Sequence, residues 1–183
     1  LFLSKRVLEA EEDVEVLKEI QNLAKTNGVK VVYLAQGDKI SDGKMSFLCL
    51  YPEGNGDKTE NRNNQSLVLL LQYKEFEMLL TGDVEKAGEL EIARQEYFGV
   101  NGKIDVLKVA HHGSSGSSCE ELLEVLNPKL SLISCGKNNS YGHPHEETLE
   151  RLESIGSEIL STVESGAITL KIGRRIKVYE FKK

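Results

Sequence analysis

The chain has 183 residues and a formal net charge of −6, and its composition is 39% hydrophobic and 28% charged. These values fit one globular domain, predicted over residues 1–183, and the acidic balance argues against a surface devoted to nucleic acid, because phosphate binding usually leaves a basic footprint. No apolar run approaches the ~18 residues of a membrane span, and the start carries no signal-peptide pattern.

The first half of the chain predicts one helix followed mainly by strands. Apolar side chains at helical spacing, an acidic first turn and a terminal glycine favour a helix over residues 9–28. A polar stretch rich in glycine and asparagine predicts a flexible loop at residues 53–64. The apolar runs on either side of this loop predict strands at residues 29–40 and 44–52, and a pair with a tight turn at 73–75 within residues 65–83.

The second half alternates strands and helices. Helices are predicted at residues 84–98, 118–126 and 145–156. Strands are predicted at residues 103–110, 129–136 and 158–182, the last of these ranges turning at 165–166 and 173. This alternation, with antiparallel hairpins at both ends, predicts a mixed α/β layered fold.

Neither the cysteines nor the basic residues form a clear functional motif. The three cysteines, Cys49, Cys119 and Cys135, lack C-x-x-C spacing and an even-numbered framework, so reduced and mostly buried thiols are expected. A soft metal is an alternative use for Cys135, although packing is favoured. The carboxyl-terminal basic segment is either a solvated hairpin face, which is favoured, or an edge that tracks phosphates; its cations are Lys171, Arg174, Arg175, Lys177, Lys182 and Lys183.

All four histidines lie in two short segments, "VAHHGS" and "YGHPHE". His111 and His112 follow a buried strand and lead into a flexible glycine loop. Because neighbours on an extended backbone point to opposite sides, one of the pair should face a site and the other should support it or contact substrate. His143 and His145 flank Pro144, which holds the backbone extended so that both rings can face one direction. The alternative is that Pro144 is the first residue of a helix and the two histidines only mark its start.

Asp83 follows the apolar strand that ends "LLTG" and precedes a predicted helix. Taken alone, it is more readily the N-cap of that helix than a metal-bridging carboxylate at a strand end. However, the ends of successive strands in an alternating α/β stretch converge on one edge of a sheet, which would bring Asp83 to both histidine pairs. Carboxylate and imidazole ligands suit zinc or a similar divalent cation, which would activate water as a nucleophile.

The spaced motifs resemble the metallo-β-lactamase-like domain at the carboxyl end of ComEC-type competence proteins. The resemblance covers most of the chain and rests on "NNQSLVLLL", "LLTGD", "DVLKVAHHGS", "NPKLSLISCGKNNSYGHPH" and "SGAITLKI". It implies an αββα sandwich of metal-dependent hydrolases, carried by a polytopic membrane protein that takes up single-stranded DNA. The implied partners are DNA and the transmembrane channel domains of the same polypeptide, and the implied location is a soluble domain of a cell-membrane protein, with the extracytoplasmic side favoured.

The resemblance also implies site residues. Asp83, His111, His112 and His143 correspond to metal ligands, with Asp83 and His112 in catalysis and zinc, or manganese, as the metal. Which of His111 and His112 touches the metal is left open. Together with the basic edge, the predicted substrate contacts are Asn64, Ser66, Ser114, His145, Arg174 and Arg175.

One departure from the family pattern limits the prediction. The H-x-H-x-D-H motif of the superfamily is absent, because no histidine precedes His111. A catalytic zinc normally needs three protein ligands, so one metal can be held but a two-metal centre cannot be completed. We therefore expect the amino-terminal part of the domain to be missing and the chain by itself to be inactive.

The predicted function is a metal-dependent phosphodiesterase that acts on DNA during uptake in the intact protein. Two alternatives stay open: a non-catalytic DNA-handling or docking module of the uptake channel, and a lactonase-like hydrolase of small molecules.

Overall fold

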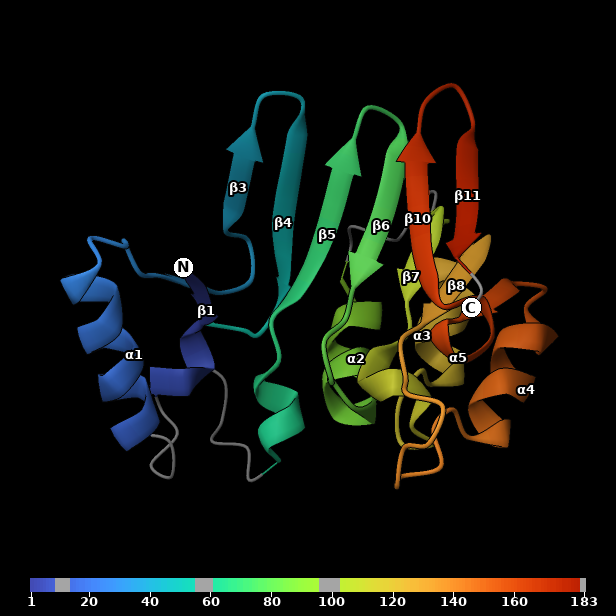
Figure 1. Cartoon of the computed structure of the whole chain (residues 1–183), viewed down its shortest axis with the longest axis horizontal. Helices are drawn as coiled ribbons and strands as arrows, with labels where there is room; N and C mark the ends of the chain where they lie inside the picture. Colours follow the sequence, from blue (N-terminus) through green and yellow to red (C-terminus); the bar gives the residue numbers. More distant parts are fainter. Residues whose placement is uncertain (9–13, 55–60, 96–102, 182–183) are drawn as a thin grey trace.

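The apolar runs of the middle of the chain form a seven-stranded mixed sheet. The computed structural model describes residues 1–8, 14–54, 61–95 and 103–181, and Figure 1 shows the sheet crossing the molecule. In spatial order, its strands are β3 (Lys39–Asp42), β4 (Met45–Tyr51), β5 (Val68–Tyr73), β6 (Phe76–Leu80), β7 (Val106–Lys108), β8 (Leu130–Ile133) and β9 (Glu158–Ser161).

The direction of pairing changes once across this sheet. Strands β3 to β6 form an antiparallel meander, and β6 to β9 run parallel. The carboxyl ends of β6, β7 and β8 therefore lie at the same edge, as the alternation of strands and helices predicted. The predicted mixed α/β fold is confirmed.

Helices cover one face of the sheet and a hairpin covers part of the other. Leu79 on β6 and Leu107 on β7 pack with the helices in the main core, whereas Phe76 and Val106, on the same strands, form a second cluster beneath the hairpin. This division follows from the alternation of side chains along a strand. The covering elements are α2 (Lys86–Ala93), α3 (Glu120–Leu126) and α4 (Glu146–Ser154), and the hairpin of β10 (Ala167–Ile172) and β11 (Ile176–Phe181) (Figure 1).

The amino-terminal segment forms a small unit of its own beside β3. Strand β1 (Phe2–Ser4) pairs parallel with β2 (Val32–Leu34), and α1 (Val14–Thr26) connects them. The single strand expected at residues 29–40 is wrong, because a turn divides it: Asp38 Oδ2 accepts the N–H of Ala35 at 2.9 Å. The chain then enters β3.

Several predicted boundaries differ from the structure. The helix expected at residues 84–98 begins at Lys86 and is described to Ala93, and the short helix α5 (Thr162–Ser165) was not predicted. Of the predicted elements, residues 9–13 of the first helix, 55–60 of the loop, 96–98 of the second helix and the terminal Lys182 and Lys183 lie outside the described residues. Among the residues described, no helix has the length and apolar character needed to cross a membrane.

Candidate metal centre

The predicted ligands meet at the edge where β6, β7 and β8 end. Asp83 follows β6, the 3₁₀ turn η5 (Ala110–Gly113) with its two histidines follows β7, and His143 lies between β8 and α4. Asp83 Oδ1 is 3.6 Å from His112 Nε2, and the His143 ring centre lies 5.5 Å from that of His111 and 6.5 Å from that of His112. The structure thus brings together the four residues predicted as metal ligands.

The two adjacent histidines face the same side, which corrects the expectation from an extended backbone. His111 and His112 adopt left-handed conformations, with φ of 44° and 57°, and their ring centres are 6.4 Å apart. Such a backbone costs roughly 1–2 kcal/mol per residue for a side chain with a Cβ. It persists where surrounding contacts fix it, and here the N–H of His111 donates to Gly82 O at 3.0 Å.

The tautomer of His112 suits metal binding. Its Nδ1 lies 2.6 Å from the carbonyl oxygen of Ser134, which can only accept, so Nδ1 carries the proton. In the neutral ring, Nε2 then keeps its lone pair, and it is the nitrogen that faces Asp83. Metal-binding histidines are commonly oriented by such a bond from the second nitrogen to a carbonyl.

The tautomer of His145 is the opposite of that of His112 and does not suit metal binding. The N–H of Ser115 donates to its Nδ1 at 3.0 Å, so the neutral ring carries its proton on Nε2 and has no lone pair left for a metal. Its ring centre lies 4.9 Å from that of His143. His145 is also the N-cap of α4, so the alternative that Pro144 is the first helical residue is wrong. The His143–Pro144 peptide bond is cis, in place of the extended arrangement expected there.

The protonation state of His143 favours coordination. Partial burial and the neighbouring rings of His145, His111 and His112 hold the pKa of His143 below its usual range, while Asp83 acts in the opposite direction. Neutral imidazole, the form that binds metals, is therefore favoured at neutral pH.

Glu85 belongs to the centre although the sequence did not indicate it. It occupies the N-cap position of α2 without a side-chain capping bond, so the alternative that Asp83 is the N-cap is wrong. Glu85 Oε1 lies 3.5 Å from His111 Nδ1, a buried atom with no hydrogen-bond partner among the described residues. The amides of Asn61 and Asn63 donate to the two Glu85 oxygens at 2.6 and 2.7 Å. A carboxylate fixed in this way can orient the His111 ring.

The polar motif around Asn64 braces the same turn. The buried side chain of Asn64 accepts the N–H of Glu85 at 3.0 Å, and Ser66 Oγ accepts the N–H of Asp83 at 3.0 Å. These bonds hold the backbone that presents both carboxylates. The distance of Asn64 and Ser66 in sequence from Asp83 concealed this role, because the contacts exist only after folding.

The glycine- and serine-rich loop after His112 is tightly held, contrary to the expectation of a flexible loop. The fully buried carboxylate of Glu89 accepts the N–H groups of Ser118 and Cys119 at 2.6 and 2.8 Å. From the other side, the Arg151 guanidinium donates to loop carbonyls at 2.9–3.1 Å, and Thr148 Oγ1 donates to the carbonyl of Ser114 at 2.9 Å. The paired histidines therefore sit on a rigid support.

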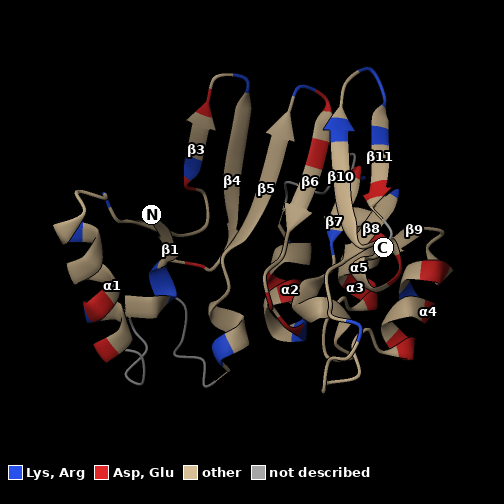
Figure 2. Cartoon of the chain, in the orientation of Figure 1, with Lys and Arg blue, Asp and Glu red and all other residues tan. Residues whose placement is uncertain are grey.

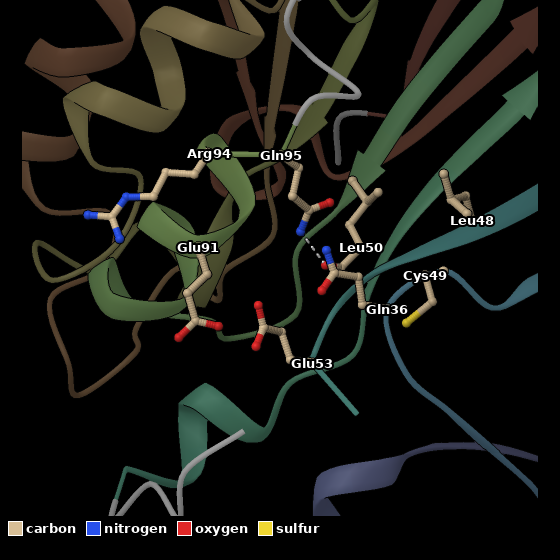
Figure 3. Close-up of a pocket in the computed structure, with 9 residues that line it drawn as sticks. Gln36, Leu48, Cys49, Leu50, Glu53, Glu91, Arg94 and Gln95 are labelled. Atoms are coloured by element: carbon tan, nitrogen blue, oxygen red, sulfur yellow. Dashed lines mark hydrogen bonds between the residues drawn. The ribbon is translucent and has the colours of Figure 1, made fainter. Parts of the chain in front are cut away.

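A cavity of about 320 Å³ opens beside the histidines, lined by His112, Ser134, Cys135, Gly136, Asn139, Tyr141 and His143. A larger cavity of about 590 Å³ lies near β4 and α2 and has no histidine in its lining. Figure 3 shows the carboxylates of Glu53 and Glu91 facing one another among the residues that line this second cavity, while the Arg94 side chain points away from them. The cavity next to the metal ligands is thus the smaller one.

The carboxylate and imidazole groups are of the kinds that bind a divalent cation, but the imidazole rings lie farther apart than they would around a shared ion. Two imidazoles that share a zinc ion at ~2.1 Å have ring centres roughly 5 Å apart, whereas the His111, His112 and His143 rings are 5.5–6.5 Å apart. Consistently, within the described ranges no three His, Cys, Asp or Glu side chains already surround a common metal position. The free Nε2 of His112 is an available donor, and His111, whose Nδ1 faces Glu85, would bind through its Nε2.

The basic hairpin is not part of this centre. Arg174 and Arg175 lie between β10 and β11. Figure 1 shows that turn at the opposite end of the sheet from the carboxyl end of β6, and Figure 2 shows Lys and Arg colour on the hairpin strands next to it. The structure therefore does not bring these two predicted substrate contacts together with the histidines.

Comparisons with known proteins identify relatives of the chain. No protein-family model matches the chain. It is 36% identical over 179 residues to ComE operon protein 3 of Bacillus subtilis, a match that covers 98% of the chain and 22% of that protein. It is 39% identical to Recombination protein 2 of Haemophilus influenzae (60% of the chain, 13% of that protein) and 33% identical to Competence protein ComA of Neisseria gonorrhoeae (68% and 18%). The chain thus spans less than a quarter of the length of these relatives.

Solved structures give a fold-level match. CmlA, a diiron β-hydroxylase from Streptomyces venezuelae, superimposes with a TM-score of 0.51 at 14% identity, over 75% of the chain and 34% of CmlA. A zinc-dependent hydrolase of the metallo-β-lactamase superfamily from Thermotoga maritima gives a TM-score of 0.39 at 14% identity (73% and 74%), a value too low to establish a common fold by itself. The chain is therefore a homologue of one part of the ComEC-type competence proteins, and its mixed α/β fold is shared with part of CmlA.

Proposed function

We propose that the chain supplies part of a metal-dependent phosphodiesterase site that acts on DNA in a competence protein. The observation that carries the proposal is the meeting of Asp83 with the histidines at one sheet edge, with Asp83 Oδ1 3.6 Å from His112 Nε2. DNA as the substrate class is supported by relatives whose names refer to competence and recombination.

Each residue has a definite part in this proposal. Asp83, His111, His112 and His143 would hold the cation, most favourably zinc, with manganese as the alternative. A cation held there supplies Lewis-acid chemistry, which favours attack of water on phosphorus. Asp83 and His112 are nearly half exposed, so substrate and water can reach them. His145 offers its Nε2–H as a hydrogen-bond donor to a phosphate oxygen.

Asp83 and the three histidines provide enough ligands for one metal ion but not for two. We therefore predict that the 183-residue chain alone binds a single divalent cation weakly and does not cleave DNA. A non-catalytic DNA-handling module is the second candidate function, and the observation that favours it is the wide spacing of the three rings.

The test of the proposed function uses the native polypeptide in which this chain occurs. With Zn²⁺ or Mn²⁺, it should release nucleotides from a labelled DNA strand, and Asp83→Asn should lower the rate by about 100-fold or more, since loss of an outer-shell partner alone costs 10–100-fold. DNA that is bound but not cleaved by the unaltered polypeptide would instead support the non-catalytic module.

Glu85→Ala tests how the His111 ring is oriented. Without the carboxylate 3.5 Å from His111 Nδ1, we expect the Zn²⁺ affinity of the chain to fall by about 10–100-fold. We also expect the His111 ring of the metal-free chain to move its proton from Nδ1 toward Nε2, as read from the ring ¹⁵N signals. Glu121→Ala, an exposed carboxylate in the first turn of α3, is the control. An unchanged Nδ1–H signal in Glu85→Ala would contradict the role given to Glu85.

The paired change Arg174→Ala and Arg175→Ala tests the basic hairpin. If this edge tracks phosphates, losing two contacts should weaken single-strand binding and flatten its log–log salt slope by about 1.4, at ~0.7 per contact. Metal affinity should not change, because the hairpin turn lies at the other end of the sheet (Figure 1). Lys18→Ala with Lys25→Ala, both exposed on α1, is the matched control. An unchanged slope would leave the hairpin as a solvated face.

A further inference from the structure

Tyr141 is an exposed aromatic ring at the rim of the candidate metal centre. Its side chain is 76% exposed, the highest value among the exposed large hydrophobic side chains in the described part of the chain. The ring stacks on His143, with centres 5.7 Å apart and planes 27° from parallel. One face of Tyr141 is therefore backed by a proposed metal ligand, while most of the side chain remains open to solvent.

The loop that carries Tyr141 is fixed in place. Asn139 Nδ2 donates to the carbonyls of Gly136 and His143 at 2.8 and 2.7 Å, and its Oδ1 accepts the N–H of His143 at 2.8 Å. These bonds close the segment around Tyr141 and hold the ring where a ligand would meet it. An exposed apolar ring that is held in place loses little conformational entropy when a second ring stacks on it.

The cavity next to Tyr141 leads to the proposed ligands. Its lining includes Tyr141, His112 and His143. Its volume of about 320 Å³ is at the lower end of the range for small-molecule sites. That size suits one flat ring system attached to a phosphate that reaches the histidines. Lys137, in the same loop, is exposed and can neutralise a neighbouring phosphate.

We propose that Tyr141 is a stacking platform for one base of a single-stranded nucleic acid whose phosphate lies at the histidine cluster. The proposal deepens the proposed function and rests on it for the choice of substrate. Bases of a single strand have free faces, and they stack on protein aromatic rings largely without regard to sequence. Because the chain carries a net charge of −6, phosphate attraction is weak overall, so stacking should supply a large share of the affinity.

The experiment compares two oligonucleotides of equal length and charge, one of thymidines and one of abasic sites, with the metal-free chain in chelator. The unaltered chain should bind the thymidine strand about 5- to 150-fold more tightly, the range expected for one stacked base. Tyr141→Ala should bring the two affinities together, and Tyr141→Phe should retain the difference. Tyr179→Ala, a 45% exposed tyrosine on β11, should also retain it.

Two results would overturn the platform. One is equal binding of the two strands by the unaltered chain, including no measurable binding of either. The other is a preference that survives in Tyr141→Ala while the amide spectrum shows an unchanged fold. A base preference without DNA cleavage by the native polypeptide removes the proposed phosphodiesterase and leaves the platform standing. DNA cleavage by the native polypeptide without a base preference removes the platform and leaves the proposed phosphodiesterase standing.

Discussion

Glu89→Ala is expected to lower the free energy of unfolding by about 3 kcal/mol or more. The Glu89 carboxylate is fully buried and accepts the N–H groups of Ser118 and Cys119 at 2.6 and 2.8 Å. Burial raises the pKa of Glu89, and the two N–H groups and Arg151 oppose that shift. The substitution leaves two buried donors unpaired, at a cost of about 1–3 kcal/mol each. It also removes the carboxyl group near Arg151, which keeps its hydrogen bonds to the loop carbonyls and to Thr148 Oγ1.

Urea unfolding at neutral pH measures this loss. Glu120→Ala is the matched control, because Glu120 is exposed at the start of α3 and a surface change of this kind usually stays within about 0.5 kcal/mol. A loss below about 1 kcal/mol for Glu89→Ala would mean that the serine-rich loop is not held in the way described. The support of the paired histidines would then need another explanation.

His112→Ala is expected to reduce divalent-cation affinity by about 100-fold or more. The substitution removes a nitrogen whose lone pair faces Asp83 at 3.6 Å, and loss of an outer-shell partner alone already costs 10–100-fold. His145→Ala is the contrasting variant. Its Nδ1 is occupied by the N–H of Ser115, so metal affinity should change by less than about 3-fold.

Competition titration with a Zn²⁺ indicator compares the two variants directly. Similar losses for both histidines would show that the cluster binds metal through a different set of nitrogens. A loss confined to His145→Ala would reverse the assignment of tautomers. In either case, far-ultraviolet circular dichroism of each variant separates a lost ligand from a lost fold.

The sequence predicted the edge of the sheet at which the site lies, because strand ends follow from the alternation of strands and helices. Asp83, His111, His112 and His143 each come directly after such a strand or before the next helix, and the parallel pairing of β6, β7 and β8 brings them together. That part of the prediction needed only chain order and the geometry of parallel strands.

The details within the site depended on tertiary contacts that a linear pattern does not contain. The left-handed backbone at His111 and His112 places both rings on one side, whereas the prediction assumed an extended backbone after the strand. Glu85 looked like an ordinary acidic residue in the first turn of a helix, and its link to Asn61 and His111 forms only after folding. A single exposed residue such as Tyr141 likewise gives no periodic signal.

The strand expected at residues 29–40 failed for a local reason. Its apolar residues favour an extended chain, but Gly37, with φ of 89°, and the Asp38 side chain form a turn in the middle. Asp and Gly together are a common turn signal, and here the turn separates β2 from β3. The first therefore joins β1, and the second becomes the edge strand of the main sheet.

The central claim is that Asp83 and the histidines form one metal position, and Mn²⁺ titration of the ¹⁵N-labelled chain tests it most directly. Paramagnetic broadening reports even weak binding. It should first affect the amides of Asp83, His111 to Gly113 and His143, and it should disappear in His112→Ala. Broadening that starts instead around Glu53 and Glu91, the two carboxylates of the larger cavity (Figure 3), or no localised broadening at all, would contradict the account.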